Sequence, residues 1–377
     1  MRFSHIFLPI ALAGSLMAQY PGLTLPPSGN NQRAMVTQFI GPVRVSIEYS
    51  SPSVHTAVGK DRKGEIWGKL VPYGLASLGA FGNGKPDPWR AGANENTVFT
   101  ASNEVMIEGK PLPAGRYGLH MIPGEDEWTI IFSKNSQSWG SFQYDASEDA
   151  LRVTVKPHKH DFREYLSYEF PVRKPAEAVA ELQWEELAVP MTIAVADPNE
   201  IYVSRLRHEL TSVPGFSWQG YQSAAQFCLT ANTHLDQGLQ WAEQSITQPF
   251  VGEANFTTLS TKAQLLSKLN REEEAATIMQ SAIKLPTATS LMIHQYGRQL
   301  LAAKKVDAAM TVFEYNAQRF GDVWPIHVGL MRGYAAKGDT QKALEQAKLA
   351  LAQAPDPLNK QSLADNVKAL EAGKQIN

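Results

Sequence analysis

The stretch "GYAAKGDTQKALEQAKLALAQAPDP", residues 333–357, indicates how the C-terminal half of the chain folds. Gly338 and Asp339 form a turn signal after one helical pattern, and Pro355 ends a second helical pattern. Between these signals, Ala343 and Ala347 lie one helical turn apart, on the same face of the second helix. Because both side chains are small, a neighbouring helix can approach closely. The stretch therefore predicts two helices joined by a short turn and packed as a pair.

Three earlier stretches, which begin near residue 223, repeat this pattern of helix, polar break and helix. Small residues recur in the second helices every 33 to 37 residues, at Gly238, Ala275, Ala308 and Ala343. This periodicity is typical of a solenoid of helix pairs, and a period near 34 resembles the tetratricopeptide repeat (TPR). Residues 359–373 are expected to form a polar-faced cap helix. An irregular helical bundle is the alternative.

The preceding part of the chain, from Val43 to about Val195, alternates apolar and polar residues instead. Runs with this period are expected to be strands at residues 43–49, 97–102, 104–109, 116–122, 127–133, 151–156, 164–170 and 178–189. Turn signals separate them, among them "EGKPLPAG", "PGED", "KPHKHD" and "RKPAEA". Many short strands with turns between them predict an antiparallel β-sandwich (jelly-roll-like) or a barrel, and we expect the sandwich.

The strand-rich part resembles a bacterial family known only as a domain of unknown function, family 2911. The residues that carry the resemblance are "YSSPSV" (49–54), "IWGKLVPYG" (66–74), "WRAGANENT" (89–97), "LPAGRYGLHMIPG" (112–124), "EWTIIFSK" (127–134), "WGSFQY" (139–144) and "LQWEEL" (182–187). It covers roughly Met35 to Val195. The resemblance implies a protein that is often exported and sometimes carries helical repeats, but it implies no catalytic or binding residue.

One insertion departs from that family pattern. Residues 75–88, "LASLGAFGNGKPDP", separate a Tyr-Gly pair from a Trp-Arg pair that the resemblance places almost next to each other. The insertion is expected to form a lid or rim beside the loop that follows, or to be surface decoration.

The first 18 residues predict an export signal. Arg2 and His5 supply a basic end, residues 6–12 an apolar run and Ala18 a small residue at the cleavage position. Leu16 is bulky for such a site, which leaves the cut position open, and a buried N-terminal helix is the alternative. The expected domains are a signal peptide (1–18), a flexible segment (19–34), the β-sandwich (35–197) and the TPR-like repeats with their cap (198–377). The mature protein is expected to be periplasmic or extracellular.

Composition excludes some partners. The formal charge is −2 and no basic run is present, so nucleic acid is not an expected partner. The apolar run of the signal is too short to span a membrane, and no other stretch is long and apolar enough. Cys228 is the single cysteine, so the exported chain is expected to have no internal disulfide. Its helical spacing from Ala224 and Ala225 favours a small core residue over a reactive thiol.

The polar stretch "WRAGANENT" has two interpretations. As a ligand-binding loop it would use Arg90 to bind a carboxylate or phosphate, and Glu95 as an acid or base. As a structural corner it would pair Arg90 with Glu95 or with backbone carbonyls, with Gly92 at a positive φ. The sequence slightly favours the corner. The candidate ligand-binding residues are Trp89, Arg90, Asn94, Glu95, Asn96 and His120.

Other chemistry has weaker support. His158 and His160 would share one strand face and are the candidate metal ligands, but a hairpin turn is expected at that point. No nucleophile elbow or phosphate-binding glycine loop is present in the required context, and we expect no cofactor. His120, between apolar neighbours, is expected to be a core histidine rather than a general base. Most tryptophans are expected in the core, with Trp89 and Trp139 as candidates for a sugar platform.

The helical repeats point to partner binding, since such solenoids present extended surfaces to a peptide or protein segment. The candidate partner-binding residues, all on first helices, are Tyr221, Gln295, Arg298, His327 and Arg332. The favoured function is therefore an exported interaction protein, in which the sandwich supports the repeats or holds a small polar ligand near Arg90. The alternatives are an exported hydrolase-like enzyme, using Arg90, Glu95 and either His120 or the His158/His160 pair, and a structural component of the envelope.

Overall fold

The computed structural model describes residues 31–77 and 84–376. The chain divides into two compact units, Met1–Pro198 and Asn199–Asn377. The expected signal peptide and cleavage position lie outside the described residues. The segment expected to be flexible, residues 19–34, is described only from residue 31, and a strand begins at Gln32.

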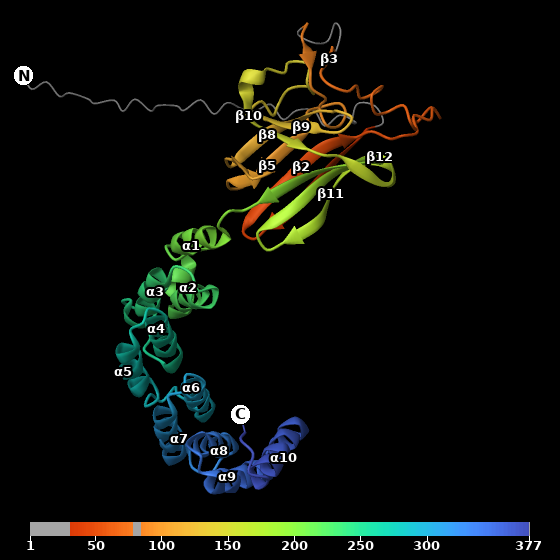
Figure 1. The fold of residues 1–377 in the computed structure, drawn as a ribbon. Helices are drawn as coiled ribbons and strands as arrows, with labels where there is room; N and C mark the ends of the chain where they lie inside the picture. Colours follow the sequence, from red (N-terminus) through yellow and green to blue (C-terminus); the bar gives the residue numbers. More distant parts are fainter. Residues whose placement is uncertain (1–30, 78–83, 377) are drawn as a thin grey trace, which may run out of the picture. The chain divides into compact units, whose positions relative to one another are not determined.

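The first unit is built from antiparallel strands (Figure 1). The strands are β1 (Gln32–Ile40), β2 (Val43–Ser51), β3 (Ala76–Ser77), β4 (Pro86–Asp87), β5 (Val98–Ala101), β6 (Val105–Ile107), β7 (Lys110–Leu112), β8 (Gly115–Ile122), β9 (Trp128–Ser133), β10 (Asp149–Val155), β11 (His158–Lys174) and β12 (Glu177–Ala194). A short 3-10 helix, Ala146–Glu148, precedes β10.

Two of the sheets form the sandwich. The larger has the order β1-β2-β5-β8-β9-β10, and the smaller has the order β11-β12-β6-β7. Val43, Val45 and Ile47 alternate with more exposed residues along β2 and are fully buried, as the period-two pattern requires. The inner faces of the two sheets meet where the ring of Tyr49 on β2 lies 4.9 Å from that of Tyr168 on β11, edge to face. The expected antiparallel sandwich is confirmed.

Two details differ from the predicted strands. The edge strand β1 was not expected, because its exposed Met35 and Phe39 interrupt the pattern of a half-buried strand. The turn expected at "KPHKHD" is shorter than predicted: β11 begins at His158 and continues through residues 160 and 161 as one long strand. Shifts in its pairing with β12 allow this, and Glu185, in β12, takes a φ of 56° beside one of them.

The insertion forms a small arm in its described part. Ala76 pairs with Asp87 and Ser77 with Pro86, so β3 and β4 make a two-stranded antiparallel ladder. Residues 78–83, between these strands, lie outside the described residues. The described part therefore shows local pairing at the base of the insertion.

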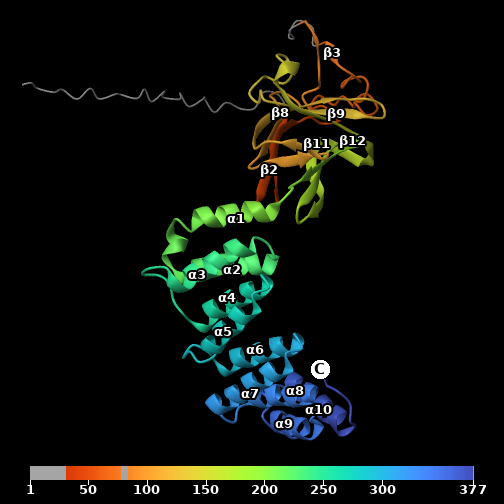
Figure 2. The ribbon, with the colours of Figure 1, turned by 60° about the vertical axis from the view of Figure 1, so that its left-hand side comes forward.

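The second unit is helical in its described residues (Figure 2). The helices are α1 (Pro198–Glu209), α2 (Trp218–Ala231), α3 (Leu235–Thr247), α4 (Phe256–Lys268), α5 (Glu272–Ala282), α6 (Ser290–Ala302), α7 (Val306–Phe320), α8 (Trp324–Lys337), α9 (Thr340–Ala352) and α10 (Pro357–Glu371). A 3-10 turn, Val213–Phe216, links α1 to α2. We number the repeats α2–α3, α4–α5, α6–α7 and α8–α9, followed by the cap helix α10.

Local sequence accounts for several of the helix ends. Asn255 and Thr258 form a reciprocal capping box at the start of α4. Asp339 accepts a hydrogen bond from the Lys342 backbone N–H at 3.1 Å at the start of α9, and Gly338 ends α8 with a φ of 81°. The "GD" signal in the opening stretch therefore ends one helix and begins the next. The helical-pair solenoid expected from the sequence is confirmed.

The small residues of the second helices lie where neighbouring helices approach. A Cβ on Gly238 would lie 2.6 Å from Cβ of Cys228, and Ala275 and Ala343 are buried. In the third repeat the sequence pattern identified the wrong residue, because Ala308 is exposed and Ala309 is buried. Cys228 is fully buried in the first repeat, which confirms it as a core residue.

The junction between the second and third repeats differs from the others. Helix α4 packs closely on α2 and α3, and α8 packs closely on α6 and α7. Close backbone approach between α4 or α5 and α6 is sparse by comparison. Arg319 of α7 instead holds the connecting segment, by donating to the carbonyl oxygens of Ile283 at 2.5 Å and Leu285 at 2.7 Å. The solenoid is therefore more open at this junction.

Candidate functional site

Residues 89–97 are joined to the larger sheet by backbone hydrogen bonds. Trp89 exchanges two backbone hydrogen bonds with Met121 of β8, each 2.8 Å long. Gly92 does not take the positive φ expected of it; Ala91 and Asn94 take it instead, at 51° and 55°. Gly92 is required for space, because a Cβ there would lie 2.7 Å from Oγ1 of Thr97.

Arg90 is held within the unit. Its Nη1 donates to the backbone oxygen of Asn94 at 2.5 Å, and its guanidinium lies 4.6 Å from the centre of the Phe142 ring. Gly140 leaves room for this group, since a Cβ there would lie 2.3 Å from the guanidinium carbon. Burial lowers the pKa of Arg90. Of the two structural pairings expected for Arg90, the one with a backbone carbonyl is present.

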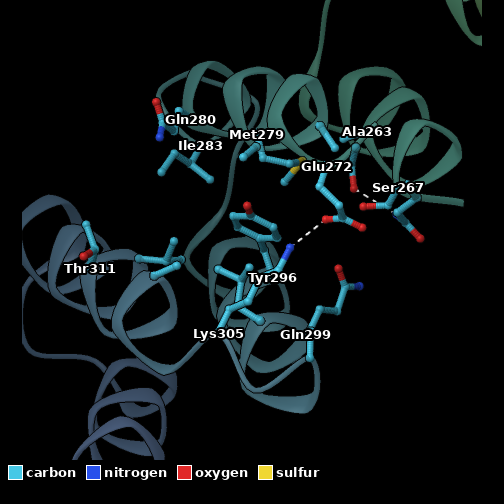
Figure 3. Close-up of a pocket in the computed structure, with 18 of the residues that line it drawn as sticks. Ala263, Ser267, Glu272, Met279, Gln280, Ile283, Tyr296, Gln299, Lys305 and Thr311 are labelled. Carbon is cyan, nitrogen blue, oxygen red and sulfur yellow. Dashed lines mark hydrogen bonds and ion pairs between the residues drawn. The ribbon is translucent and has the colours of Figure 1, made fainter. Parts of the chain in front are cut away.

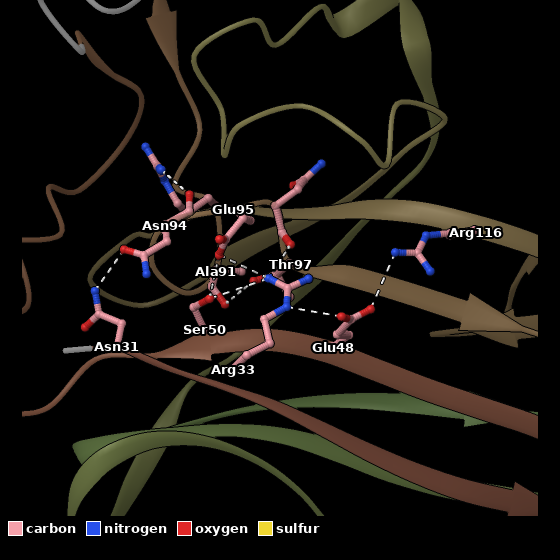
Figure 4. Close-up of polar contacts among 11 residues, drawn as sticks. Asn31, Arg33, Glu48, Ser50, Ala91, Asn94, Glu95, Thr97 and Arg116 are labelled. Atoms are coloured by element: carbon pink, nitrogen blue, oxygen red, sulfur yellow. Dashed lines mark hydrogen bonds and ion pairs between the residues drawn. The ribbon is translucent and has the colours of Figure 1, made fainter. Parts of the chain in front are cut away.

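Glu95 and Asn94 are bonded to the edge of the sheet (Figure 4). Ser50 donates to the Glu95 carboxylate at 2.9 Å, and Arg33 of β1 lies 3.5 Å from the same oxygen. Asn31 donates its side-chain amide to Oδ1 of Asn94 at 3.0 Å. Arg33 also forms an ion pair with Glu48 at 3.1 Å, which extends the polar contacts along the sheet.

The end of the loop joins it to other segments. Asn96 donates to the backbone oxygen of Asn135 and to Oγ of Ser138, both at 3.1 Å. The Ala91 carbonyl accepts from Thr97 at 3.2 Å and from Tyr168 of the smaller sheet at 2.9 Å. These bonds give residues 89–97 the contacts of a structural corner that connects both sheets.

His120 is a core histidine, as expected. It is 1% exposed, and its Nδ1 lies 2.8 Å from Oγ of Ser141. Burial, with a further contribution from the Arg90 charge, lowers the pKa of His120 to about 4. A general base is most effective with a pKa near the operating pH and within reach of substrate. His120 is buried and its lowered pKa is far from neutral pH, and Glu95 has its own partners, Ser50 and Arg33.

The two candidate metal ligands have separate neighbours. Nε2 of His158 lies 3.8 Å from the carboxylate of Glu181, and Nδ1 of His160 lies 2.7 Å from the backbone oxygen of Asp161. Within residues 31–77 and 84–376, no three His, Cys, Asp or Glu side chains are grouped so that they could hold a metal ion.

Four of the five tryptophans of the first unit form one cluster. The Trp67 ring lies 5.3 Å from that of Trp128, 5.6 Å from Trp184 and 6.0 Å from Trp89, in edge-to-face arrangements. Trp89 therefore packs with core aromatic residues rather than forming an open platform. Trp139 is 49% exposed.

The candidate partner-binding residues of the helices do not form one exposed surface. Gln295 and Arg298 are exposed, whereas Tyr221 and His327 are buried and Arg332 is half-buried. The expectation of exposure was therefore wrong for Tyr221 and His327. His327 contacts Asp322 and Gln346, so it joins α8 to its neighbours. First helices of a solenoid pack against the next repeat as well as facing solvent, and the sequence period does not separate the two faces.

A cavity of about 1060 Å³ lies at the open junction of the second and third repeats (Figure 3). Helices α4 and α5 form one side and α6 and α7 the other. Its buried apolar lining residues are Leu229, from α2, together with Ala263, Ala275, Met279, Ile283 and Val312. Tyr296 also lines it, and burial, followed by the charge of Glu272, raises the pKa of Tyr296.

Polar side chains surround this apolar lining. Glu272 and Lys305 form an ion pair of 2.6 Å that links the second repeat to the third. The other polar lining residues are Ser260, Gln264, Ser267, Lys268, Gln280, Lys284, Gln299 and Thr311. Sequence analysis missed this cavity; the signal available was the set of small residues Ala275, Ala276, Ala303 and Ala308, which fill little of the junction.

These observations define a class: an antiparallel β-sandwich followed in sequence by a TPR-like helical solenoid. Residues 31–193 match the family described as "Protein of unknown function (DUF2911)". The resemblance expected from the sequence motifs is thereby confirmed for the first unit. No curated protein matches this chain.

Solved structures similar to this chain include the following three. The hetero-tetramer Cut9-Hcn1 of the APC/C is 13% identical, with a TM-score of 0.32, and the match covers 46% of this chain and 34% of that one. YrrB, a TPR protein with an unusual peptide-binding site, is 18% identical, with a TM-score of 0.31. The match covers 44% of this chain and 83% of YrrB. A thermophilic TPR protein of Thermus thermophilus is 16% identical, with a TM-score of 0.32. The match covers 46% of this chain and 90% of that protein. The chain thus spans about a third of the first of these.

Proposed function

We propose that this chain is an exported bacterial interaction protein whose helical repeats bind a protein or peptide partner. The observation that carries the proposal is the cavity between the second and third repeats. It combines a buried apolar lining with a polar rim, which is the composition of sites that bind organic ligands and peptide segments.

Export is supported by the pattern of residues 1–18, a short basic end followed by an apolar run and a small residue. No helix in the described ranges, 31–77 and 84–376, is long and apolar enough to cross a membrane. Expression in a Gram-negative host tests export. The chain is expected in the periplasmic fraction with its N-terminus processed, and Leu8→Arg within the apolar run is expected to leave it unprocessed in the cytoplasm.

In this proposal, partner binding belongs to the helical unit. The corner of residues 89–97 has a structural role within the first unit. A small polar ligand near Arg90 is the second candidate, favoured by the Glu95 side chain, which is 41% exposed, and by the buried Oδ1 of Asn96, which accepts no hydrogen bond within the described residues. Thermal unfolding with added carboxylates and sugars distinguishes the two roles. A ligand that binds the folded state raises the melting temperature, and the structural role predicts no shift.

Selection of peptides tests the main proposal. A displayed library of random 12-residue peptides would be selected on the purified full chain, and the recovered peptides measured by fluorescence polarisation. Ala276→Trp places a bulky side chain in the cavity from an exposed position, and Ala352→Trp adds the same group to an exposed alanine of α9 that does not line the cavity. We expect binding to wild type and to Ala352→Trp, and weak binding to Ala276→Trp. Equal binding to all three proteins would contradict the proposed site.

A further inference from the structure

We propose that the cavity between the second and third repeats binds an extended peptide segment in which bulky apolar side chains lie beside an acidic residue. The inference rests on the proposed function and adds the chemistry of the partner to it. Three features of the lining support this inference: its apolar part, its glutamine amides that make no hydrogen bond within the described residues, and the excess of positive charge at its rim.

The apolar part of the cavity accepts more than one side chain. Met279 and Val312 are 4% and 7% exposed, and they lie on opposite sides of the junction, on α5 and α7. Ala263 and Ala275 add little volume between them. The cavity volume of about 1060 Å³ exceeds what a single leucine or phenylalanine would fill. A segment with two or more large apolar residues therefore fits the space better than one with a single anchor.

Amide side chains on both sides of the cavity suit a peptide backbone. Gln280 on α5 and Gln299 on α6 are exposed, and neither side chain makes a hydrogen bond within the part of the chain that the structure describes (Figure 3). Gln264 already donates to Ser260 at 3.1 Å. Each glutamine amide offers two donors and one acceptor, which match the C=O and N–H of a peptide group. An acyl chain offers no such partner, so the lining favours a peptide over a lipid.

The rim carries unbalanced positive charge. Of its charged residues, Lys305 is paired with Glu272, and this leaves Lys268 and Lys284. Neither of these two lysines has a carboxylate within 4.0 Å among the described residues. Both are exposed, and each can pair with an acidic group of a bound segment without prior loss of an internal partner. Complementarity of charge therefore selects an acidic peptide over a basic one.

Three labelled peptides test the inference on the full chain. The probe has the sequence Gly-Ser-Asp-Leu-Phe-Asp-Leu-Ser-Gly; the second peptide has Lys in place of both Asp; the third has Ser in place of Leu and Phe. We expect fluorescence polarisation to detect the acidic apolar probe most strongly. The Lys peptide and the Ser peptide are each expected to bind about tenfold more weakly or less.

Charge reversal at the rim provides the matched protein variants. Lys268→Glu combined with Lys284→Glu should weaken binding of the acidic probe about tenfold and strengthen binding of the Lys peptide. Lys360→Glu combined with Lys368→Glu makes the same change of net charge on α10, away from the lining residues, and should leave both peptides unchanged. Gln280→Ala combined with Gln299→Ala should weaken all peptides that bind. Circular dichroism checks that each variant is folded.

The outcomes separate this inference from the function on which it rests. If peptides bind and Ala276→Trp blocks them, but charge reversal changes nothing, the proposed function stands and the acidic preference is wrong. If no peptide binds but dodecanoate does, and Ala276→Trp blocks it, the cavity is a lipid site and the peptide proposal is overturned. If Ala276→Trp binds the probe as tightly as wild type, the cavity is not the site.

Discussion

The Lys305 ammonium lies 2.6 Å from the Glu272 carboxylate, and this ion pair joins the second repeat to the third at the rim of the cavity. Close backbone approach is sparse at this junction, and the pair adds a side-chain link between α5 and the start of α7 to the apolar contacts there. The side chains are 46% and 52% exposed, which allows water and salt to weaken the attraction.

We therefore predict a small coupling between these two residues. A double-mutant cycle with Glu272→Gln and Lys305→Met, measured by urea unfolding, should give a coupling free energy below about 1 kcal/mol. The hydrogen bond from Lys305 lowers the pKa of Glu272. The coupling is thus present above the ordinary pKa of a glutamate and should disappear as the pH falls through the lowered value. A coupling that survives at pH 2 would contradict this assignment.

Arg90→Ala should destabilise the first unit. It removes the 2.5 Å bond to the Asn94 carbonyl and the contact with the Phe142 ring, and we expect a loss of about 2–3 kcal/mol. Hydrogen exchange of the β8 amides, read by mass spectrometry, reports on this unit alone. Arg163→Ala removes an exposed arginine on β11 and serves as the control, with an expected change below about 0.5 kcal/mol. Equal exchange in both variants would mean that Arg90 is not a structural residue.

Gly140→Ala should destabilise the first unit more than a glycine substitution that only strains the backbone. Gly140 has a φ of 61°, and an added Cβ would lie 2.3 Å from the Arg90 guanidinium. Gly109 has a φ of 75° with open space around it, so Gly109→Ala measures the strain alone, about 1–2 kcal/mol. The same exchange measurement should show a larger loss for Gly140→Ala. If the two losses are equal, Arg90 moves aside without cost.

Acid should weaken the first unit partly through His120. Burial lowers its pKa from an ordinary 6.5 to about 4, so the folded state binds its proton less readily than the unfolded state. The neutral imidazole of His120 therefore contributes to the free energy of unfolding. This contribution is fully present above pH 6.5 and is lost as the pH falls toward 4, and the loss is at most about 3 kcal/mol. Urea unfolding at several pH values should show a steeper acid loss for wild type than for His120→Gln. Parallel curves would contradict the lowered pKa.

The sequence was sufficient to predict much of the fold because two periods dominate it. The inward residues of β2 and the small residues of α5 and α9 follow directly from alternation and from the helical repeat. The edge strand β1 was missed because an edge strand of this sheet exposes Met35 and Phe39, which breaks the pattern. The assignment of Ala308 instead of Ala309 shows that a period alone leaves the register uncertain by one residue.

The candidate sites were harder to predict, since they depend on contacts between distant segments. The partners of Arg90 and Glu95 include Phe142, Ser50 and Arg33, none of which is near them in sequence. The cavity lies between helices of two different repeats, and the segment that connects α5 to α6 is bonded to Arg319 of α7, far along the chain. No local pattern reports such a distance.

The most direct test of the account is the methyl signal of Met279, which lies on the apolar lining of the cavity. The chain has 10 methionines, and Met279→Leu assigns this one in a spectrum of the full chain labelled with ¹³C at the methionine methyl groups. Titration with the acidic apolar probe should shift the Met279 methyl signal in a saturable manner, and Ala276→Trp should abolish the shift. A probe that binds while the Met279 signal stays unchanged would contradict the account.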